Sequence, residues 1–192
     1  MKNIVLFGPP GAGKGTQAEK LIAKYGLDHV STGDVIRAEI KSGSELGKLV
    51  KSYTDKGELV PDQVVIDIIA DYVLKHKTGN GNIFDGFPRN IAQANDLNEI
   101  LAKRGESVTG VVGIMISDEV VRKRIAHRAA IEGRADDASD ETITNRINTY
   151  HAQTEPLIAF YKEAGKYYEC NGDQGSIADN RAIVLALVET IK

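Results

Sequence analysis

Residues 8–16 read Gly-Pro-Pro-Gly-Ala-Gly-Lys-Gly-Thr, directly after the apolar run 4–7 and directly before a segment, 17–25, whose apolar residues follow helical spacing. Glycines let the backbone turn so that several N–H groups hold a phosphate at the start of a helix. Lys14 would add a positive charge on the outer phosphates. The order of strand, glycine loop and helix therefore predicts a phosphate-binding loop and a nucleotide-binding protein.

Gly15 follows this lysine, where the general loop pattern has Ser or Thr, and Thr16 comes one place later. A direct hydroxyl ligand for magnesium is therefore left open. A glycine-rich turn without a ligand is the alternative, but such a turn needs fewer glycines and no lysine.

The composition is that of a soluble globular protein. The chain has 192 residues, 27% charged and 42% hydrophobic, and a net charge of −3, so we expect one domain and no nucleic-acid partner. Cys170 is the single cysteine, so we expect no internal disulfide and a reducing compartment. We expect Cys170 itself to be a small core residue. Met1 leads straight into the first strand and no apolar run is long enough for a membrane. We expect no membrane association and a cytoplasmic protein.

Strand patterns alternate with helix patterns along the chain, which predicts a parallel sheet covered on both faces. In such sheets, ligands bind beyond the carboxyl ends of the strands. The five predicted strands are 3–7, 28–31, 82–85, 111–117 and 167–170.

Two segments have the composition of mobile covers over this edge. The first, 31–60, contains two thinly apolar helices between the second and third strands, and Thr32 or Asp34 could cap the earlier helix or bind a ligand. The second is the short loop 129–137. The helix after the fourth strand is expected to begin with Asp118 as its N-cap.

Asp85 ends the third strand beside the phosphate loop, where a carboxylate would hold magnesium directly or through water. A helix cap or a lone buried acid is the alternative.

Arginines cluster on segments that follow the strands. Arg124 and Arg128 are four residues apart and share one helix face, which without an anion would be only a solvated basic face. Bringing two phosphorylated nucleotides together in a dry cleft needs many such charges. No side chain is placed as a general base, which fits a phosphate acceptor that is already ionised. The six candidates are Arg37, Arg89, Arg124, Arg128, Arg134 and Arg146.

The rival hypothesis is a nucleotide-dependent switch or scaffold that binds without transfer. A guanine-nucleotide switch would need an Asn-Lys-x-Asp motif, which the sequence lacks, and a scaffold would not need a second set of arginines. The four histidines show no metal-ligand spacing.

The sequence resembles the nucleoside monophosphate kinases, most closely the adenylate kinases with a short lid. The resemblance runs nearly from end to end and rests on residues 8–16, 31–34, 57–61, 85–89, 133–137 and 155–158. It implies a single P-loop kinase domain over 1–192, an α/β three-layer fold with a five-stranded parallel sheet, a nucleoside monophosphate-binding flap at 31–60 and a lid at 127–137.

The resemblance also implies the chemistry: reversible transfer of a phosphoryl group from MgATP to AMP, giving two ADP. In this family Gly15 is usual and Mg²⁺ is held mostly through water, here by Asp85. Longer lids of some relatives bind zinc through cysteines, so none is expected here. A monomer is expected.

By the same resemblance, ATP would contact Gly11, Ala12, Gly13, Lys14, Gly15, Thr16, Arg124, Arg128 and Gly175. AMP would contact Thr32, Arg37, Glu58, Leu59, Val60, Gly86, Phe87, Pro88, Arg89, Gln93, Arg134 and Arg146. The catalytic residues would be Lys14, Arg89, Arg124, Arg128, Arg134 and Arg146, of which Arg134 and Arg146 would bridge the transferring group when the lid closes.

The choice of acceptor rests on three residues. Thr32 and Gln93 resemble the adenine-selective pattern, since an amide can pair with the edge of adenine. Asn90 resembles the UMP/CMP kinases, which have Asn after the corresponding arginine but usually Ala in place of Thr32. AMP is therefore expected, with UMP or CMP as the alternative.

Overall fold

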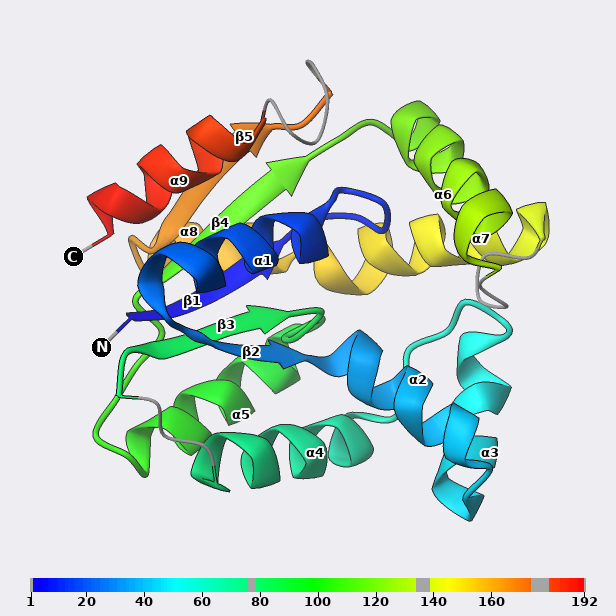
Figure 1. Ribbon diagram of the computed structural model, residues 1–192, viewed down its shortest axis with the longest axis horizontal. Coiled ribbons are helices and arrows are strands. Elements are labelled where there is room, and N and C mark those ends of the chain that lie inside the picture. The colour runs from blue at the N-terminus through cyan, green and yellow to red at the C-terminus, as the bar shows by residue number, and fades with distance from the viewer. Residues whose placement is uncertain (1, 76–78, 134–138, 174–179, 192) are drawn as a thin grey trace.

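The computed structural model describes residues 2–75, 79–133, 139–173 and 180–191 (Figure 1). Its centre is one parallel sheet with the strand order β2-β3-β1-β4-β5. The strands are β1 (Lys2–Phe7), β2 (Asp28–Ser31), β3 (Gly81–Asp85), β4 (Gly110–Met115) and β5 (Tyr167–Asn171). The α/β fold with a five-stranded parallel sheet is thus confirmed.

The helices of the described residues connect these strands. They are α1 (Lys14–Tyr25), α2 (Thr32–Ser42), α3 (Glu45–Thr54), α4 (Asp62–Lys75), α5 (Ile91–Ala102), α6 (Asp118–Glu132), α7 (Asp140–Thr149), the π-helical turn η2 (Tyr150–Thr154), α8 (Leu157–Glu163) and α9 (Asn180–Thr190).

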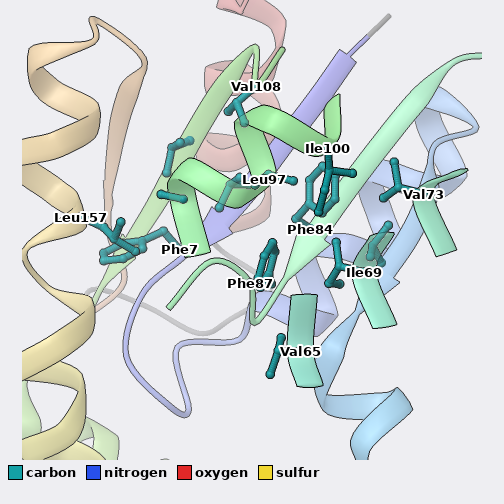
Figure 2. Close-up of a cluster of buried hydrophobic side chains, with 14 of the residues drawn as sticks. Phe7, Val65, Ile69, Val73, Phe84, Phe87, Leu97, Ile100, Val108 and Leu157 are labelled. Atoms are coloured by element: carbon teal, nitrogen blue, oxygen red, sulfur yellow. The ribbon is translucent and has the colours of Figure 1, made fainter. Parts of the chain in front are cut away.

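Two apolar clusters cover the two faces of the sheet. On one face, side chains of α4, α5 and α8 pack against Phe7 and Phe84 (Figure 2). On the other face, α1, α6 and α9 pack against Ile4, Leu6 and Ile114. The strands are buried on both faces because successive residues of β1 point alternately into the two clusters, which is why their sequences are apolar throughout. Cys170 is buried in the second cluster, as predicted.

The starts of two helices differ from the predictions. Ser31, not Thr32 or Asp34, caps α2, because its hydroxyl accepts from the N–H of Asp34. Ser117 occupies the N-cap position of α6, and Asp118 is the first residue of the helix. β4 ends at Met115, two residues earlier than predicted, where its carbonyl accepts from the N–H of Gly172.

The α2–α3 segment, residues 31–60, extends beyond the carboxyl end of the sheet, on the side where α6 and α7 also lie (Figure 1). Among the described residues, no helix is both long and apolar enough to span a membrane.

Candidate active site

The glycine loop lies between β1 and α1. Gly8, Gly11 and Gly13 all have positive φ angles, and Gly13 is the N-cap of α1. A Cβ atom on Gly8 would lie 2.4 Å from the carbonyl oxygen of Ile114 on the neighbouring strand, so no larger residue fits there. The loop backbone is therefore shaped by glycines at the start of a 12-residue helix, whose free N–H groups favour an anion.

Lys14 is folded back onto this loop. Its ammonium group donates to the carbonyl oxygens of Gly8 (2.8 Å) and Pro9 (3.0 Å). The pKa of Lys14 is lowered to about 8, chiefly by burial; the charges of Arg89, Arg146 and Arg128 act in the same direction, and Asp85 opposes them. The lysine is therefore buried beside other charged groups, and a bound phosphate would stabilise its charged form.

Asp85 ends β3 beside Leu6 of β1, and its carboxylate faces the first turn of α1. A Cβ atom on Gly15 would lie 3.6 Å from Asp85 Oδ2. His29 Nε2 lies 3.8 Å from the same oxygen, too far for a hydrogen bond. The carboxylate thus lies at the junction of β3 and the phosphate loop, as the sequence predicted.

A cleft of about 270 Å³ opens at this edge of the sheet, between the phosphate loop, the α2–α3 segment and α7. It is lined by most of the residues expected to contact AMP: Thr32, Arg37, Glu58, Leu59, Val60, Gly86, Pro88, Arg89, Gln93 and Arg146, together with Lys14. Phe87 does not line the cleft; its side chain packs in the apolar core instead (Figure 2).

Thr32 and Arg89 meet at Gly86. The Thr32 hydroxyl donates to the Gly86 carbonyl at 2.9 Å, and Arg89 Nε donates to the same oxygen at 2.8 Å. Gly86 has a φ of 80°, and a Cβ atom there would lie 2.7 Å from the Thr32 hydroxyl. The turn therefore needs glycine in order to bring Arg89 against the cleft.

Arg37 lies one turn into α2, as predicted. Its guanidinium group contacts Asp34 and stacks over Gly33, where a Cβ atom would lie 3.0 Å from Arg37 Nη1. The ion pair with Asp34 is largely exposed and therefore weak, so Arg37 can exchange it for an anion at little cost.

Asn90 and Gln93 differ in their relation to the cleft. The Asn90 side chain caps α5, because its oxygen accepts from the N–H of Gln93 at 2.9 Å. Its amide nitrogen donates to Asp62. Asn90 does not line the cleft. Gln93 lines the cleft, and its amide is held between the N–H of Arg89 and Asp62. The structure thus gives Asn90 a structural role that sequence reasoning missed.

The tip of the α2–α3 segment is docked on α7. Thr142, Asn145 and Thr149 donate to the carbonyl oxygens of residues 55, 56 and 57 at 3.2, 2.6 and 3.5 Å. A Cβ atom on Gly57 would lie 2.7 Å from the Thr142 carbonyl and 2.9 Å from Arg146 Cγ. This contact brings Arg146 beside the residues of the segment that line the cleft.

On the other side of the phosphate loop, Arg124 packs near Gly11. Arg124 Nη2 donates to the Gly172 carbonyl at 2.9 Å, while Nη1 is buried and has no hydrogen-bond partner within the described ranges of the chain. A buried guanidinium nitrogen without a partner is costly and is available to a ligand. Arg134 and Gly175, also expected in the site, lie outside the described residues.

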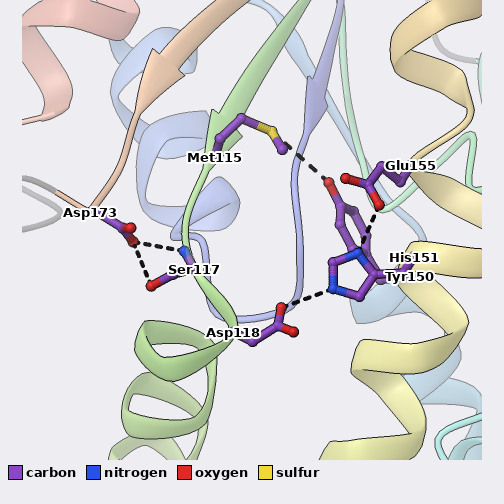
Figure 3. Close-up of polar contacts among 7 residues, drawn as sticks. All are labelled: Met115, Ser117, Asp118, Tyr150, His151, Glu155 and Asp173. Atoms are coloured by element: carbon purple, nitrogen blue, oxygen red, sulfur yellow. Dashed lines mark hydrogen bonds and ion pairs between the residues drawn. The ribbon is translucent and has the colours of Figure 1, made fainter.

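His151, in the π-helical turn, connects this turn to the start of α6 (Figure 3). Its ring nitrogens lie 2.7 Å from Glu155 and 2.9 Å from Asp118 at the start of α6. Hydrogen bonds to these two carboxylates raise the pKa of His151 above its usual value. The adjacent Tyr150 lines the cleft, and desolvation raises the pKa of its hydroxyl well above the usual value. Sequence reasoning missed this histidine bridge, because Asp118 is 33 residues away from His151 in the sequence.

Asp62, Tyr150 and the three polar residues of α7 were also missed. The spacing of positions 142, 145 and 149 on one helix face was the available signal. Among the described residues, no cluster of three or more His, Cys, Asp or Glu side chains could hold a metal ion.

The phosphate-binding loop and a second group of cations lie at the rim of one cleft, which is large enough for a nucleotide. This arrangement is that of a P-loop phosphotransferase of the nucleoside monophosphate kinase class. The sequence model of the family Adenylate kinase matches residues 6–166. The chain belongs to the adenylate kinase family.

Individual relatives agree. The chain is 51% identical over 172 residues to an adenylate kinase of Bacteroides thetaiotaomicron, a match that covers 90% of each chain. It is 48% identical over 191 residues to an adenylate kinase of Phocaeicola vulgatus, with complete coverage of both chains. A 48% match covers 90% of this chain and 92% of an adenylate kinase of Leptospira biflexa.

Proposed function

We propose that the chain catalyses reversible transfer of a phosphoryl group from MgATP to AMP, giving two ADP. The observation that carries this proposal is the convergence of Lys14, from the phosphate loop, with Arg89 and Arg146 at one rim of the cleft. Lys14 belongs to the donor side, and the two arginines come from the elements that follow β3 and from α7. The relatives named adenylate kinase support the same reaction.

On the donor side, residues 11–16 would hold the ATP phosphates through backbone N–H groups and Lys14. Arg124 and Arg128 would contact the same nucleotide, and Arg124 Nη1, which has no hydrogen-bond partner among the residues that the structure describes, supports this assignment. Gly175 would lie near the adenine of ATP.

On the acceptor side, AMP would occupy the 270 Å³ cleft, with Arg37 and Arg89 on its phosphate. Thr32, Gln93, residues 58–60 and residues 86–88 would surround its sugar and base. Because Phe87 is packed in the core, only its backbone would contact AMP.

Catalysis would come from alignment and charge rather than from a general base. The acceptor phosphate is already ionised, so the site must bring two anions together and exclude water. Lys14, Arg89, Arg124, Arg128, Arg134 and Arg146 would neutralise the transferring group. The lowered pKa of Lys14 supports this, because burial and, to a smaller extent, the charges of Arg89, Arg146 and Arg128 disfavour the charged lysine, which a phosphate would stabilise.

Magnesium would enter with ATP. The carboxylate of Asp85 faces the start of α1 at the phosphate loop, and Mg²⁺ is commonly held by one or two carboxylates together with phosphates and water. The residues therefore fit an ion held by Asp85 through water, and the ion would supply further neutralisation of phosphate charge.

Closure would involve two parts of one P-loop kinase domain. Residues 31–60 would act as the nucleoside monophosphate-binding flap, and their docking on α7 supports closure over the cleft. Residues 127–137 would act as the lid. The described part of this lid, 127–133, is the end of α6 and its glycine cap. We further propose a cytoplasmic monomer.

UMP or CMP as acceptor was the alternative, and it depended on Asn90. In the structure the Asn90 side chain caps α5 and contacts Asp62 instead of the cleft, so the residue on which this alternative depended does not support a pyrimidine nucleotide. Thr32 and Gln93 line the cleft instead.

Initial rates of transfer from MgATP to AMP, CMP, UMP and GMP, measured separately, test the proposal. AMP should be preferred, and Arg89→Ala should lower kcat by about 10³-fold or more, as for arginines that stabilise transferring phosphoryl groups. Arg122→Ala is the matched control, because Arg122 is an exposed arginine of α6 paired with Asp140 at 3.0 Å. Binding of ATP without transfer to any acceptor would contradict the proposal and favour a non-catalytic switch.

A further inference from the structure

Gln93 is held by partners of opposite hydrogen-bonding character. Its Oε1 accepts from the backbone N–H of Arg89 at 2.8 Å, and its Nε2 donates to Asp62 Oδ1 at 2.6 Å. A backbone N–H only donates and a carboxylate only accepts, so the amide can satisfy both in a single orientation. Gln93 is also 1% exposed, so water cannot replace either partner without rearrangement.

Asp62 is itself positioned by a second amide. Asn90 Nδ2 donates to Asp62 Oδ1 at 2.9 Å and to Oδ2 at 3.2 Å. The Asn90 amide is fixed in turn, because its Oδ1 accepts from the N–H of Gln93. Asp62 is the first residue of α4, where a negative charge is stabilised by the helix. The carboxylate is therefore a fixed acceptor between the starts of α4 and α5.

A held amide can distinguish bases that a free amide cannot. An amide has two N–H donors and two acceptor lone pairs, so Gln93 keeps one donor and one acceptor for a ligand. Adenine offers a donor at the 6-amino group and an acceptor at N1. A 6-oxopurine offers the reverse at the same two positions, and an amide turned by 180° would match it equally well. Selectivity between the two bases therefore depends on what prevents the amide from turning.

We propose that Asp62 is a specificity-determining positioning residue, which fixes the Gln93 amide in the orientation that accepts a 6-aminopurine monophosphate and rejects a 6-oxopurine monophosphate. Asp62 does not line the cleft, so it acts through Gln93 rather than on the nucleotide. The inference rests on the proposed function, in which Gln93 reads the acceptor base.

The test uses AMP and inosine monophosphate as acceptors, because these nucleotides differ only at the purine 6 position and N1. In Asp62→Ala the carboxylate acceptor is lost. A hydrogen bond to a charged group contributes about 1.5–3 kcal/mol, so the kcat/KM ratio of AMP over inosine monophosphate should fall by about 10- to 150-fold. The decrease in kcat/KM for AMP should come mainly from a higher KM for AMP. Asp62→Asn should give an intermediate ratio, because a carboxamide can accept or donate and so permits both orientations.

Asp67→Ala is the matched control. Asp67 accepts from the Gln63 amide at 2.7 Å, the same kind of pair on the exposed face of the same helix, and the ratio should not change. The Gln93 side-chain N–H resonances give an independent readout. One of them should exchange slowly with solvent in the wild type and rapidly in both Asp62 variants.

Two failures can be told apart. If the wild type does not use AMP, the proposed function is wrong. If the wild type prefers AMP but both Asp62 variants keep its AMP over inosine monophosphate ratio, the role of Asp62 is wrong and the residue only supports the helix starts. If Asp62→Ala does not fold, the result with the nearly isosteric Asp62→Asn decides.

Discussion

Substitution of Gly57 by alanine should undock the tip of the α2–α3 segment from α7. Gly57 has a φ of 72°, and a Cβ atom there would lie 2.7 Å from the Thr142 carbonyl and 2.9 Å from Arg146 Cγ. A left-handed backbone costs a non-glycine residue about 1–2 kcal/mol. Overlap of this kind in a packed contact costs about 1–3 kcal/mol more. When the tip moves away from α7, the overlap is relieved but the cost of the left-handed backbone remains.

Gly43→Ala separates the two costs. Gly43 lies in the same segment with a φ of 71°, but a Cβ atom there would have nothing within 4 Å. It should carry the backbone cost alone, lowering the melting temperature without changing KM for AMP. The difference between the two variants therefore isolates the contact with α7.

The overlap cost of about 1–3 kcal/mol corresponds to a shift of about 5- to 150-fold in the equilibrium between docked and undocked tips. The KM for AMP should rise in Gly57→Ala once the undocked form dominates, up to about that factor, while the KM for ATP changes less. Steady-state kinetics at saturating ATP, with a fluorescence pair on α3 and α7, measures both effects. An equal KM for AMP in the two glycine variants would refute the argument that docking on α7 supports acceptor binding.

Two further predictions concern protons. The pKa of Lys14 is lowered to about 8 without nucleotide, so at about pH 9 most of the lysine is neutral. The phosphates of ATP favour the charged lysine. Binding of ATP at this pH should therefore take up protons, and the affinity for ATP should fall as the pH rises. Calorimetry in buffers of different ionisation enthalpy measures this uptake, which should disappear in Lys14→Met. The pKa of His151 is raised by Glu155 and Asp118, so its stabilising effect is complete below its unfolded pKa and is lost as the pH rises through the folded pKa. His151→Gln should therefore lower the melting temperature more at about pH 6 than at about pH 9, and a difference that is the same at both pH values would contradict the charged bridge.

The strands and the phosphate loop could be predicted because their signals are local. Apolar runs such as 4–7 and 111–114 are buried on both faces, and the glycine pattern of residues 8–15, followed by a helix, is typical of a loop that holds phosphate. The register of the sheet then brings Asp85 to the phosphate loop, as expected from its place at the end of a strand.

The structural role of Asn90 could not be predicted, because it depends on Asp62, which is 28 residues away in the sequence. A capping asparagine and a ligand-reading asparagine look the same until the neighbouring helix is placed. The helix caps at Ser31 and Ser117 were missed for a similar reason: adjacent polar residues compete for the cap, and backbone geometry decides between them.

The three hydrogen bonds that dock the α2–α3 segment on α7 use side chains from α7 and backbone from the segment. Thr142, Asn145 and Thr149 supply all three donors, and the segment supplies backbone carbonyls, which at positions 55 and 56 any residue would provide. The two sides of this contact should therefore tolerate mutation very differently. In a library of single substitutions selected for growth, positions 55 and 56 should accept most residues, whereas the donors on α7 should accept few. Evolution can thus vary the surface and charge of the tip while the contact itself is kept.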